Sequence, residues 1–315
     1  MAAIAPIVSG QFLAAQDKAL YMGIMQEPSG IDFDRMEVFN LKTSNQRNEK
    51  FSTNSLFGTF APKPVGGSPV QDTAQQLWIK YIWMRSFGKR IDITMEAMQD
   101  DPKGIIRQVW DAAKELRNNW EYTLETLHWN YLTSIWSTAT AALNLYQYGA
   151  SYYPLFSLTH VTATPGVTWR NRFTNSVQLN RATLEAGITQ MGLNCMNWRG
   201  QLQGYKPAKI LTGWSLAPTV ARLLANQGVP ESADNGPNWI AGQVRGSVAP
   251  MLFTNDGSWA LMADKSKLDF FTFNRMGLQV QNLSVNDTLN SSRVAAARVG
   301  YGGITPIGWF GNVPA

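Results

Sequence analysis

Hydrophobic positions recur with helical spacing over an unusually long stretch, residues 94–136. Asp101 can accept hydrogen bonds from the free N–H groups of a first helical turn, and Pro102 lacks a donor where none is needed. The pattern predicts one amphipathic helix that begins there and runs about 45–50 Å at about 1.5 Å per residue. Its apolar side chains, spaced close to 3.6 residues apart, are Ile105, Val109, Ala113, Leu116, Trp120, Leu124, Leu127, Tyr131 and Ile135.

The apolar stripe predicts that one face of this helix is buried along its whole length. The residues on which we expect its start and packing to depend are Asp101, Val109, Leu116, Trp120, Leu124 and Leu127. Charged and amide side chains fall on the other side of the helix, away from the buried face: Asp111, Lys114, Glu115, Asn118, Glu121 and Glu125.

Before the helix, residues 46–93 predict a long hairpin. Its two extended segments flank APKPVGGSP at residues 61–69, whose prolines and paired glycines continue neither a strand nor a helix. Apolar residues lie on both faces, and such a hairpin is not stable alone in water. It therefore either folds back on its own subunit or lies on a neighbour. Contact candidates are Leu56, Phe57, Phe60, Lys63 near the tip, Trp78, Trp83, and Lys89 and Arg90 at the base.

The remaining pattern predicts a mixed α+β protein. Residues 1–45 lack a clean core pattern and are typical of an arm, extended up to about residue 43. Residues 151–180 are rich in loops, and residues 230–250 are turn-rich and predicted to be an exposed loop. Helices are expected at 183–191 and 216–226, and strands at 208–212, 251–253, 259–262, 268–273, 277–285 and 294–307.

Composition favours a folded protein whose surface largely meets other protein. The chain has 315 residues and is 44% hydrophobic but only 16% charged, with 12 Trp, 14 Phe and 10 Tyr, so few charges are available to cover the exterior. We find neither a membrane span nor a signal peptide and expect a cytosolic protein. A net charge of +5 without a basic run allows loose contact with polyanions and does not indicate sequence-specific DNA reading.

Catalytic and metal-binding patterns are not found in the sequence. With His128 and His160 as its two histidines and Cys195 as its one cysteine, the chain has no zinc-binding pair or cluster, and no nucleotide-binding loop occurs. We therefore expect no enzyme, cofactor or metal, and structural roles for these three residues. Asp100 and Asp101 fit helix capping better than paired-carboxylate catalysis. The tryptophans could be a stacking platform, but their spacing favours core or interface positions: Trp78, Trp83, Trp110, Trp120, Trp129 and Trp136.

The order of these parts resembles the major capsid protein of tailed bacteriophages, the Johnson fold. The resemblance covers most of the chain and depends on the order and spacing of short motifs. These are IDITME at residues 91–96, Asp100 and Asp101 before the long helix, PLFS at 154–157 with Thr159 and His160, KPAKIL at 206–211, SWALMAD at 258–264 and RVGYG at 298–302.

The resemblance implies an N-terminal arm (1–45), an E-loop (46–93), a P-domain with a spine helix (94–165) and C-terminal strands (266–315), and an αβ A-domain (166–265). Such subunits form pentamers and hexamers that build an icosahedral shell around double-stranded DNA, held non-specifically. A separate scaffolding protein, a portal and a decoration protein are expected partners, and a membrane is not. Some relatives join neighbours through Lys–Asn isopeptide bonds, for which Lys63 is the only loosely suitable candidate.

The sequence thus favours a structural subunit of a virion, assembled in the host cytoplasm. The alternative is an aromatic-rich protein that binds glycan or single-stranded nucleic acid, and a further one is a hydrolase without a recognised motif. A binding protein would remain a small particle, whereas a capsid subunit would form capsomers or shells.

Overall fold

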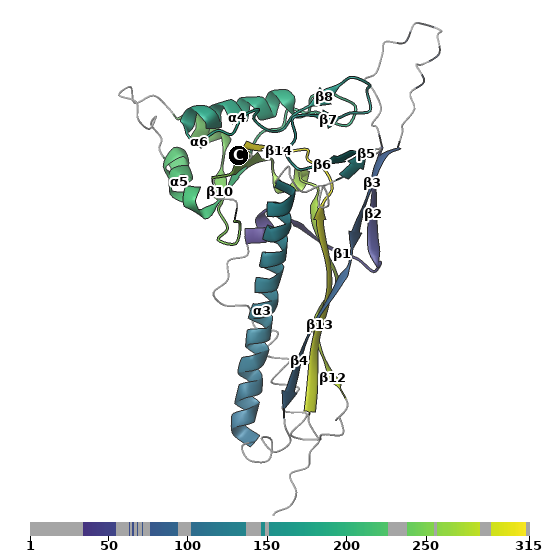
Figure 1. Cartoon of the computed structure of the whole chain (residues 1–315), viewed down its shortest axis with the longest axis vertical. Helices are drawn as coiled ribbons and strands as arrows, with labels where there is room; N and C mark the ends of the chain where they lie inside the picture. The colour runs from purple at the N-terminus through teal and green to yellow at the C-terminus, as the bar shows by residue number, and fades with distance from the viewer. Residues whose placement is uncertain are drawn as a thin grey trace, which may run out of the picture.

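The computed structural model describes residues 34–54, 63, 65, 68, 71, 76–93, 102–136, 146–148, 151–225, 238–254, 257–283 and 291–312. Figure 1 shows an elongated part, in which one helix runs beside long strands, and a wider part at one end, where a second sheet lies among shorter helices. The long helix, α3, spans Pro102–Trp136 and has 35 residues. At about 1.5 Å per residue it measures about 52 Å. The predicted long helix is confirmed, and Asp101, its expected cap, lies outside the described residues.

The elongated part contains a four-stranded sheet in the order β1-β12-β13-β4. Its strands are β1 (Asn40–Thr43), β12 (Phe270–Leu283), β13 (Ser291–Gly303) and β4 (Arg85–Ile93). β1 pairs with β12 in parallel, and the other neighbours are antiparallel. The two strands predicted at 268–273 and 277–285 are therefore one strand, which continues through two register shifts between Asn274 and Gln279. A bulge of this kind bends a strand without ending it.

The predicted hairpin is confirmed in its stem. β2 (Asn48–Asn54) pairs antiparallel with β3 (Gln76–Trp83), and the register joins Asn48 to Trp83. β4, which we placed in the same hairpin region, instead pairs with β13 along its whole length. The chain therefore leaves the hairpin at about residue 84 and enters the four-stranded sheet directly.

The wider part is built on a second four-stranded sheet in the order β10-β9-β11-β14. Its strands are β10 (Gly246–Val248), β9 (Lys209–Thr212), β11 (Trp259–Met262) and β14 (Trp309–Asn312), with helices α4 (Arg181–Asn194), α5 (Ala217–Ala225) and α6 (Trp239–Gln243) around them (Figure 1). The predictions of α4, α5, β9 and β11 are confirmed.

A reciprocal capping box between Asn180 and Thr183 fixes the start of α4. Shorter elements are η1 (Asp34–Glu37), β5 (Tyr146–Tyr148), β6 (Ser151–Tyr153), β7 (His160–Val161), β8 (Thr168–Trp169), η3 (Trp214–Leu216) and η4 (Lys265–Lys267).

Two predictions in this part are wrong. The described end of the expected exposed loop, residues 238–250, forms α6 and β10, because Asn238 caps α6 and the apolar side chains of Ile240 and Val244 are buried one turn apart. The expected strand at 251–253 is a turn, in which the N–H of Phe253 donates to the Pro250 carbonyl. The apolar character of Phe253 instead reflects burial beside the rings of Trp129 and Trp136.

One aromatic core joins the two parts of the molecule. Trp136 at the end of α3 packs edge-on to Phe156 with ring centroids 4.6 Å apart, and Phe156 also contacts Trp309 of β14. Trp309 in turn packs on Phe270, the first residue of β12. All of these rings are almost fully buried. The end of the long helix, the second sheet and the four-stranded sheet are thus parts of one continuous core.

A close approach between β11 and β14 gives a test of this packing. A Cβ added at Gly311 would lie 2.6 Å from Ala260 Cβ and 2.8 Å from the Trp259 carbonyl oxygen, whereas one added at Gly192 in α4 would meet nothing within 4 Å. We expect Gly311→Ala to destabilise the protein by about 1–3 kcal/mol through overpacking. Gly192→Ala should stabilise it by about 0.5–1 kcal/mol, because glycine is a poor helix former. Urea unfolding of both variants measures the difference, and equal stabilities would contradict the packing described here.

Candidate inter-subunit surface

The β2–β3 hairpin has two faces of different character. Because side chains alternate along a strand, Trp78 and Ile82 of β3 point one way, and Ile79, Tyr81 and Trp83 point the other. Trp78 and Ile82 are each 3% exposed, while Ile79, Tyr81 and Trp83 are 38%, 43% and 57% exposed. The first face packs on its own subunit, and the second faces solvent in the single chain.

The inner face of the hairpin is held by aromatic contacts and by close backbone approach. Trp78 packs edge-on against Trp198, with ring centroids 5.5 Å apart. Phe51 of β2 stacks on Phe271 of β12 at 5.9 Å. A Cβ at Gly300 of β13 would lie only 3.0 Å from the Trp83 carbonyl oxygen, so the absence of a side chain lets β13 pass close to the end of β3. The hairpin stem is therefore attached firmly to the subunit.

We call the exposed face the outer stripe, formed by Ile79, Tyr81 and Trp83. The rings of Tyr81 and Trp83 are neighbours, with centroids 6.5 Å apart. The β2 residues paired with Tyr81 and Ile79 are Lys50 and Ser52, both exposed. A row of three large apolar side chains on one face of a hairpin is the kind of surface that marks a contact with another molecule. Of the two alternatives left open by the sequence, packing on the same subunit holds for the inner face, and contact with a neighbour stays a prediction for the outer stripe.

The predicted contact residues occupy different places. Leu56, Phe57 and Phe60 lie outside the described residues, and Lys63 is exposed. Trp83 belongs to the outer stripe. Trp78 is buried inside its own subunit, so its side chain is not accessible to a neighbour. Lys89 and Arg90 are exposed on β4, not at the base of the hairpin, and alternation places them on opposite faces of the sheet.

The spine-helix residues lie largely as expected. Leu116 and Leu124 are buried, Trp120 and Leu127 are half-buried, and the Trp120 ring packs edge-on to Phe87 of β4 at 5.5 Å. Val109 belongs to α3, but its side chain is outside the described residues. Of the tryptophans considered as a stacking platform, Trp129 and Trp136 are at most 1% exposed, so they serve as core.

The main feature that sequence reasoning missed is a buried ion cluster on the other side of α3. Glu121 and Glu125, expected away from the buried face, are 6% and 2% exposed. The Arg35 guanidinium of η1 donates to Glu121 Oε2 at 2.5 Å and to Glu125 Oε1 at 2.7 Å. Trp129 Nε1 donates to Glu125 Oε2 at 2.7 Å, and Arg117 pairs with Glu121 at 3.0 Å. The prediction was wrong because two carboxylates four residues apart on a helix can both face solvent or can both bind one buried guanidinium, as they do here. Their spacing in the sequence is the same in both cases.

Two opposing effects act on the pKa of Glu125 in this cluster. Burial raises the pKa of Glu125, while the neighbouring Arg35 charge and the Trp129 and Arg35 hydrogen bonds lower it. One turn further along α3, burial lowers the pKa of His128 to about 3, and the Arg35 charge adds to the effect. His128 Nδ1–H donates to the Leu124 carbonyl and Nε2 accepts from the Thr272 hydroxyl, both at 2.6 Å. The ring is therefore neutral and links α3 to β12.

The other candidate reactive groups are also buried and structural in their contacts. His160 Nε2–H donates to Asn171 Oδ1 at 2.9 Å, and burial lowers its pKa to about 4. Burial raises the pKa of the Cys195 thiol to about 12. Within the described ranges, no group of His, Cys, Asp and Glu is placed to hold a metal ion. Among the helices that the structure describes, none has the length and apolar character of a membrane span.

No protein-family model and no curated protein sequence matches the chain. Solved structures do match it over most of its length. A structure from Microbacterium phage Oxtober96 has 13% identity and a TM-score of 0.50, covering 95% of this chain and 99% of its own. The capsid structure of the cyanophage P-SCSP1u has 13% identity and a TM-score of 0.53, covering 92% and 90%. The capsid of an empty GTA particle has 8% identity and a TM-score of 0.51, covering 92% and 93%.

These likenesses establish the fold. The chain has the Johnson fold of phage capsid proteins, as the sequence resemblance predicted. Because the matches cover 92–95% of this chain, the fold extends over nearly its whole length.

Removing the Arg35 guanidinium should lower the free energy of unfolding by an amount that depends on pH. Arg35→Leu leaves Glu125 buried without its cation, and we expect a loss of about 3–5 kcal/mol at neutral pH. Removing Arg35 also removes the charge and the hydrogen bonds that lower the pKa of Glu125, while the burial that raises it remains, so this pKa should rise further in the variant. Protonation on acidification then stabilises the variant more than the parent, and the deficit should shrink as the pH falls towards about 5.

The matched control for this variant is Arg181→Leu, which breaks the partly exposed Arg181–Glu185 pair on α4. An ion pair near the surface contributes about 0.2–1 kcal/mol. Urea unfolding at the two pH values measures both variants. Equal losses for them, or a deficit that grows on acidification, would contradict the buried cluster.

The two histidines should make the stability of the folded protein depend on pH. Both folded-state pKa values lie below the ordinary value of 6.5, so between about pH 6.5 and 4 the unfolded chain binds protons that the folded chain does not. Stability should therefore fall as the pH is lowered from 7 to 5, by at most about 1.4 kcal/mol per pH unit for each histidine. Glu125 acts in the opposite direction and reduces the slope. Urea unfolding and ring NMR signals check this prediction, which fails if either ring titrates in the folded protein between pH 7 and 5.

Proposed function

We propose that this chain is the major capsid subunit of a tailed bacteriophage or prophage, which self-assembles into an icosahedral shell around double-stranded DNA. The observation that carries the proposal is the Johnson fold over more than nine tenths of the chain, shared with the capsid chain of the GTA particle over 92% of this chain and 93% of that one. The exposed outer stripe is in keeping with it, because a row of three large apolar side chains on one strand face offers a surface for contact with a neighbouring subunit.

Assembly in this proposal occurs through repeated contacts. Each subunit would lay the outer stripe on a neighbour in pentamers and hexamers, and many modest contacts would act together through multivalency. The partners we propose are a separate scaffolding protein, a portal, a decoration protein and the packaged DNA. Contact with DNA would be non-specific and electrostatic, in keeping with the mild net charge of +5. The chain would act in the virion after assembly in the host cytoplasm, with no catalytic role.

Negative-stain electron microscopy of the purified protein tests the proposal. We expect rings or closed shells of uniform size at raised protein concentration. A monodisperse monomer under all assembly conditions, with tryptophan fluorescence quenched by a glycan or by single-stranded DNA, would instead support a binding protein.

The outer stripe gives a sharper prediction within this proposal. Tyr81→Lys combined with Trp83→Lys places two charges on an already exposed face, so the subunit should fold with a change in unfolding free energy within about 0.5 kcal/mol. Assembly should be lost, because the contact would bury the two new charges. Thermal unfolding and sedimentation velocity measure the two effects separately.

The matched control keeps the apolar area of the stripe. Tyr81→Phe combined with Trp83→Phe should still assemble, because aromatic surface remains available for burial. Normal shells from the double-lysine variant would show that the outer stripe lies outside the contacts that hold the shell.

A further inference from the structure

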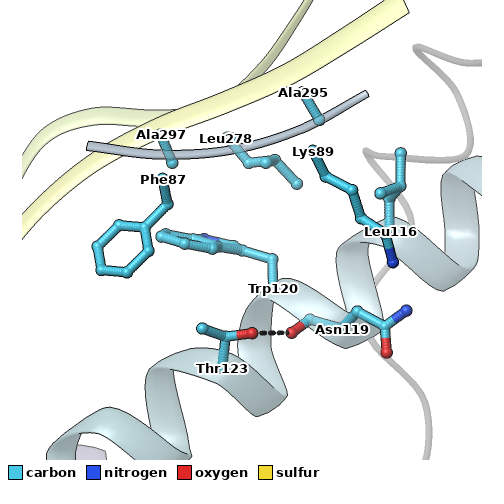
Figure 2. A pocket seen from close by; sticks show the side chains of 10 residues that line it. Phe87, Lys89, Leu116, Asn119, Trp120, Thr123, Leu278, Ala295 and Ala297 are labelled. Carbon is cyan, nitrogen blue, oxygen red and sulfur yellow. Dashed lines mark hydrogen bonds between the residues drawn. The ribbon is translucent and has the colours of Figure 1, made fainter. Parts of the chain in front are cut away.

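A hollow between α3 and the four-stranded sheet is not used by the proposed assembly contacts. It measures about 250 Å³, room for one large apolar side chain. Figure 2 shows Trp120 on the helix side with Phe87 beside it, and Ala295 and Ala297 pointing into the space from the strand above. The hollow exists because the two buried β13 positions that face Trp120 and Leu116 carry only methyl groups.

The strand that borders the hollow is an edge strand. In the part of the chain that the structure describes, β4 pairs with β13 on one side and with no strand on the other. An unpaired edge is a template on which another extended segment can add. Gly88 and Lys89 of β4 both line the hollow, so a strand added to this edge would run beside its rim.

Charge along β4 indicates what such a segment would carry. Arg85, Phe87 and Lys89 are paired with Val299, Ala297 and Ala295, so all three point to the α3 side of the sheet. Both cations are exposed, and among the ion pairs of the described residues neither has a carboxylate partner. Phe87 lies midway between them and packs on Trp120. The order along the strand is cation, aromatic ring, cation, at alternate positions.

We infer that the α3 side of β4 is a docking site for an extended acidic segment of a partner protein. The segment adds to the β4 edge, inserts one large apolar side chain into the hollow beside Phe87 and Trp120, and places a carboxylate two residues to either side, opposite Arg85 and Lys89. Directly opposed side chains on paired strands lie about 4.5–5.5 Å apart, within reach of an ion pair for these long cations. The occupant is thus an extended five-residue segment with an acidic residue at each end and a large apolar residue in the middle.

This inference does not rest on the shell-forming proposal, because the site is complete within one chain. The test uses the full-length protein at fixed concentration and fluorescence anisotropy of a labelled synthetic peptide with glutamate, threonine, leucine, threonine and glutamate at its centre. We expect saturable binding that weakens as salt is raised. Peptides with lysine in place of both glutamates, or alanine in place of leucine, should bind at least about 10-fold more weakly, since about 1.4 kcal/mol is lost with either the charge pairs or the apolar anchor.

Variants of the protein locate the site. Lys89→Glu changes an exposed side chain and should weaken the acidic peptide by at least about 10-fold while improving the lysine peptide, a charge swap that a folding defect cannot produce. Ala297→Leu fills the hollow without changing charge, so it should weaken the glutamate peptide that carries leucine and leave the glutamate peptide that carries alanine nearly unchanged. Arg298→Glu is the matched control, because Arg298 is exposed on the other face of the same sheet, and it should change binding by less than about 2-fold.

Three results would overturn the inference. The first is absence of binding by the acidic peptide to the parent protein. The second is an equal effect of Arg298→Glu and Lys89→Glu, which would mean attraction to net charge alone. The third is equal competition by a single-stranded oligonucleotide of the same charge, which would mean a general anion surface with no place for the apolar side chain.

Discussion

The long helix is buried on two sides, and the side that faces η1 depends on one guanidinium. Without Arg35, Glu125 would be a buried charge with no cation and Glu121 would keep only its pair with the partly exposed Arg117, at a cost of several kcal/mol. Holding Arg35 in place also fixes the chain that follows it. The N–H groups of Val38 and Phe39 donate to the Arg35 carbonyl, and both side chains are fully buried. β1 then begins at Asn40 and pairs with β12, so the ion cluster ties α3, η1 and the four-stranded sheet into one unit.

Elements defined by a regular apolar period were predictable from the sequence. α3 follows a 3.6-residue apolar pattern, α4 buries Leu184, Ile188 and Met191 at helical spacing, and β11 is a short run buried along its whole length. What could not be predicted are features that depend on a distant partner. Arg35 meets Glu125 from 90 positions away in the sequence, and a periodicity argument assigns charged residues to solvent by default. Phe253 belongs to the aromatic core, yet its local pattern is the same as that of a short strand.

The hairpin is a second case in which the sequence could not identify a distant partner. Because apolar residues lie on both of its faces, the sequence predicted that both faces of β3 need cover, without identifying what covers each face. The structure separates the faces because Gly300 and the aromatic pair Trp78–Trp198 allow one face to approach its own subunit closely. Of the predicted contact residues whose side chains are described, Trp83 is exposed and Trp78 is buried, although they lie on the same strand and both are tryptophan. Strand register, and not residue type, decides which of them a neighbour can touch.

A firmly attached hairpin stem with an exposed outer stripe suits assembly from many identical weak contacts. Fully covering an exposed aromatic side chain contributes about 1.5–3 kcal/mol at most, and the partial exposure of Tyr81 and Trp83 reduces that figure. One such contact is too weak to hold two subunits, since association itself costs more in lost translation and rotation. In the proposed shell, closing a ring would make each later contact intramolecular, so the same stripe would become effective only when several subunits are in register. Rigidity of the stem matters here, because a stripe that had to be ordered on contact would lose part of this small gain to side-chain and backbone entropy. In the proposed assembly, the buried Trp78 and Ile82 would contribute to association indirectly, by holding Tyr81 and Trp83 in place before any neighbour arrives.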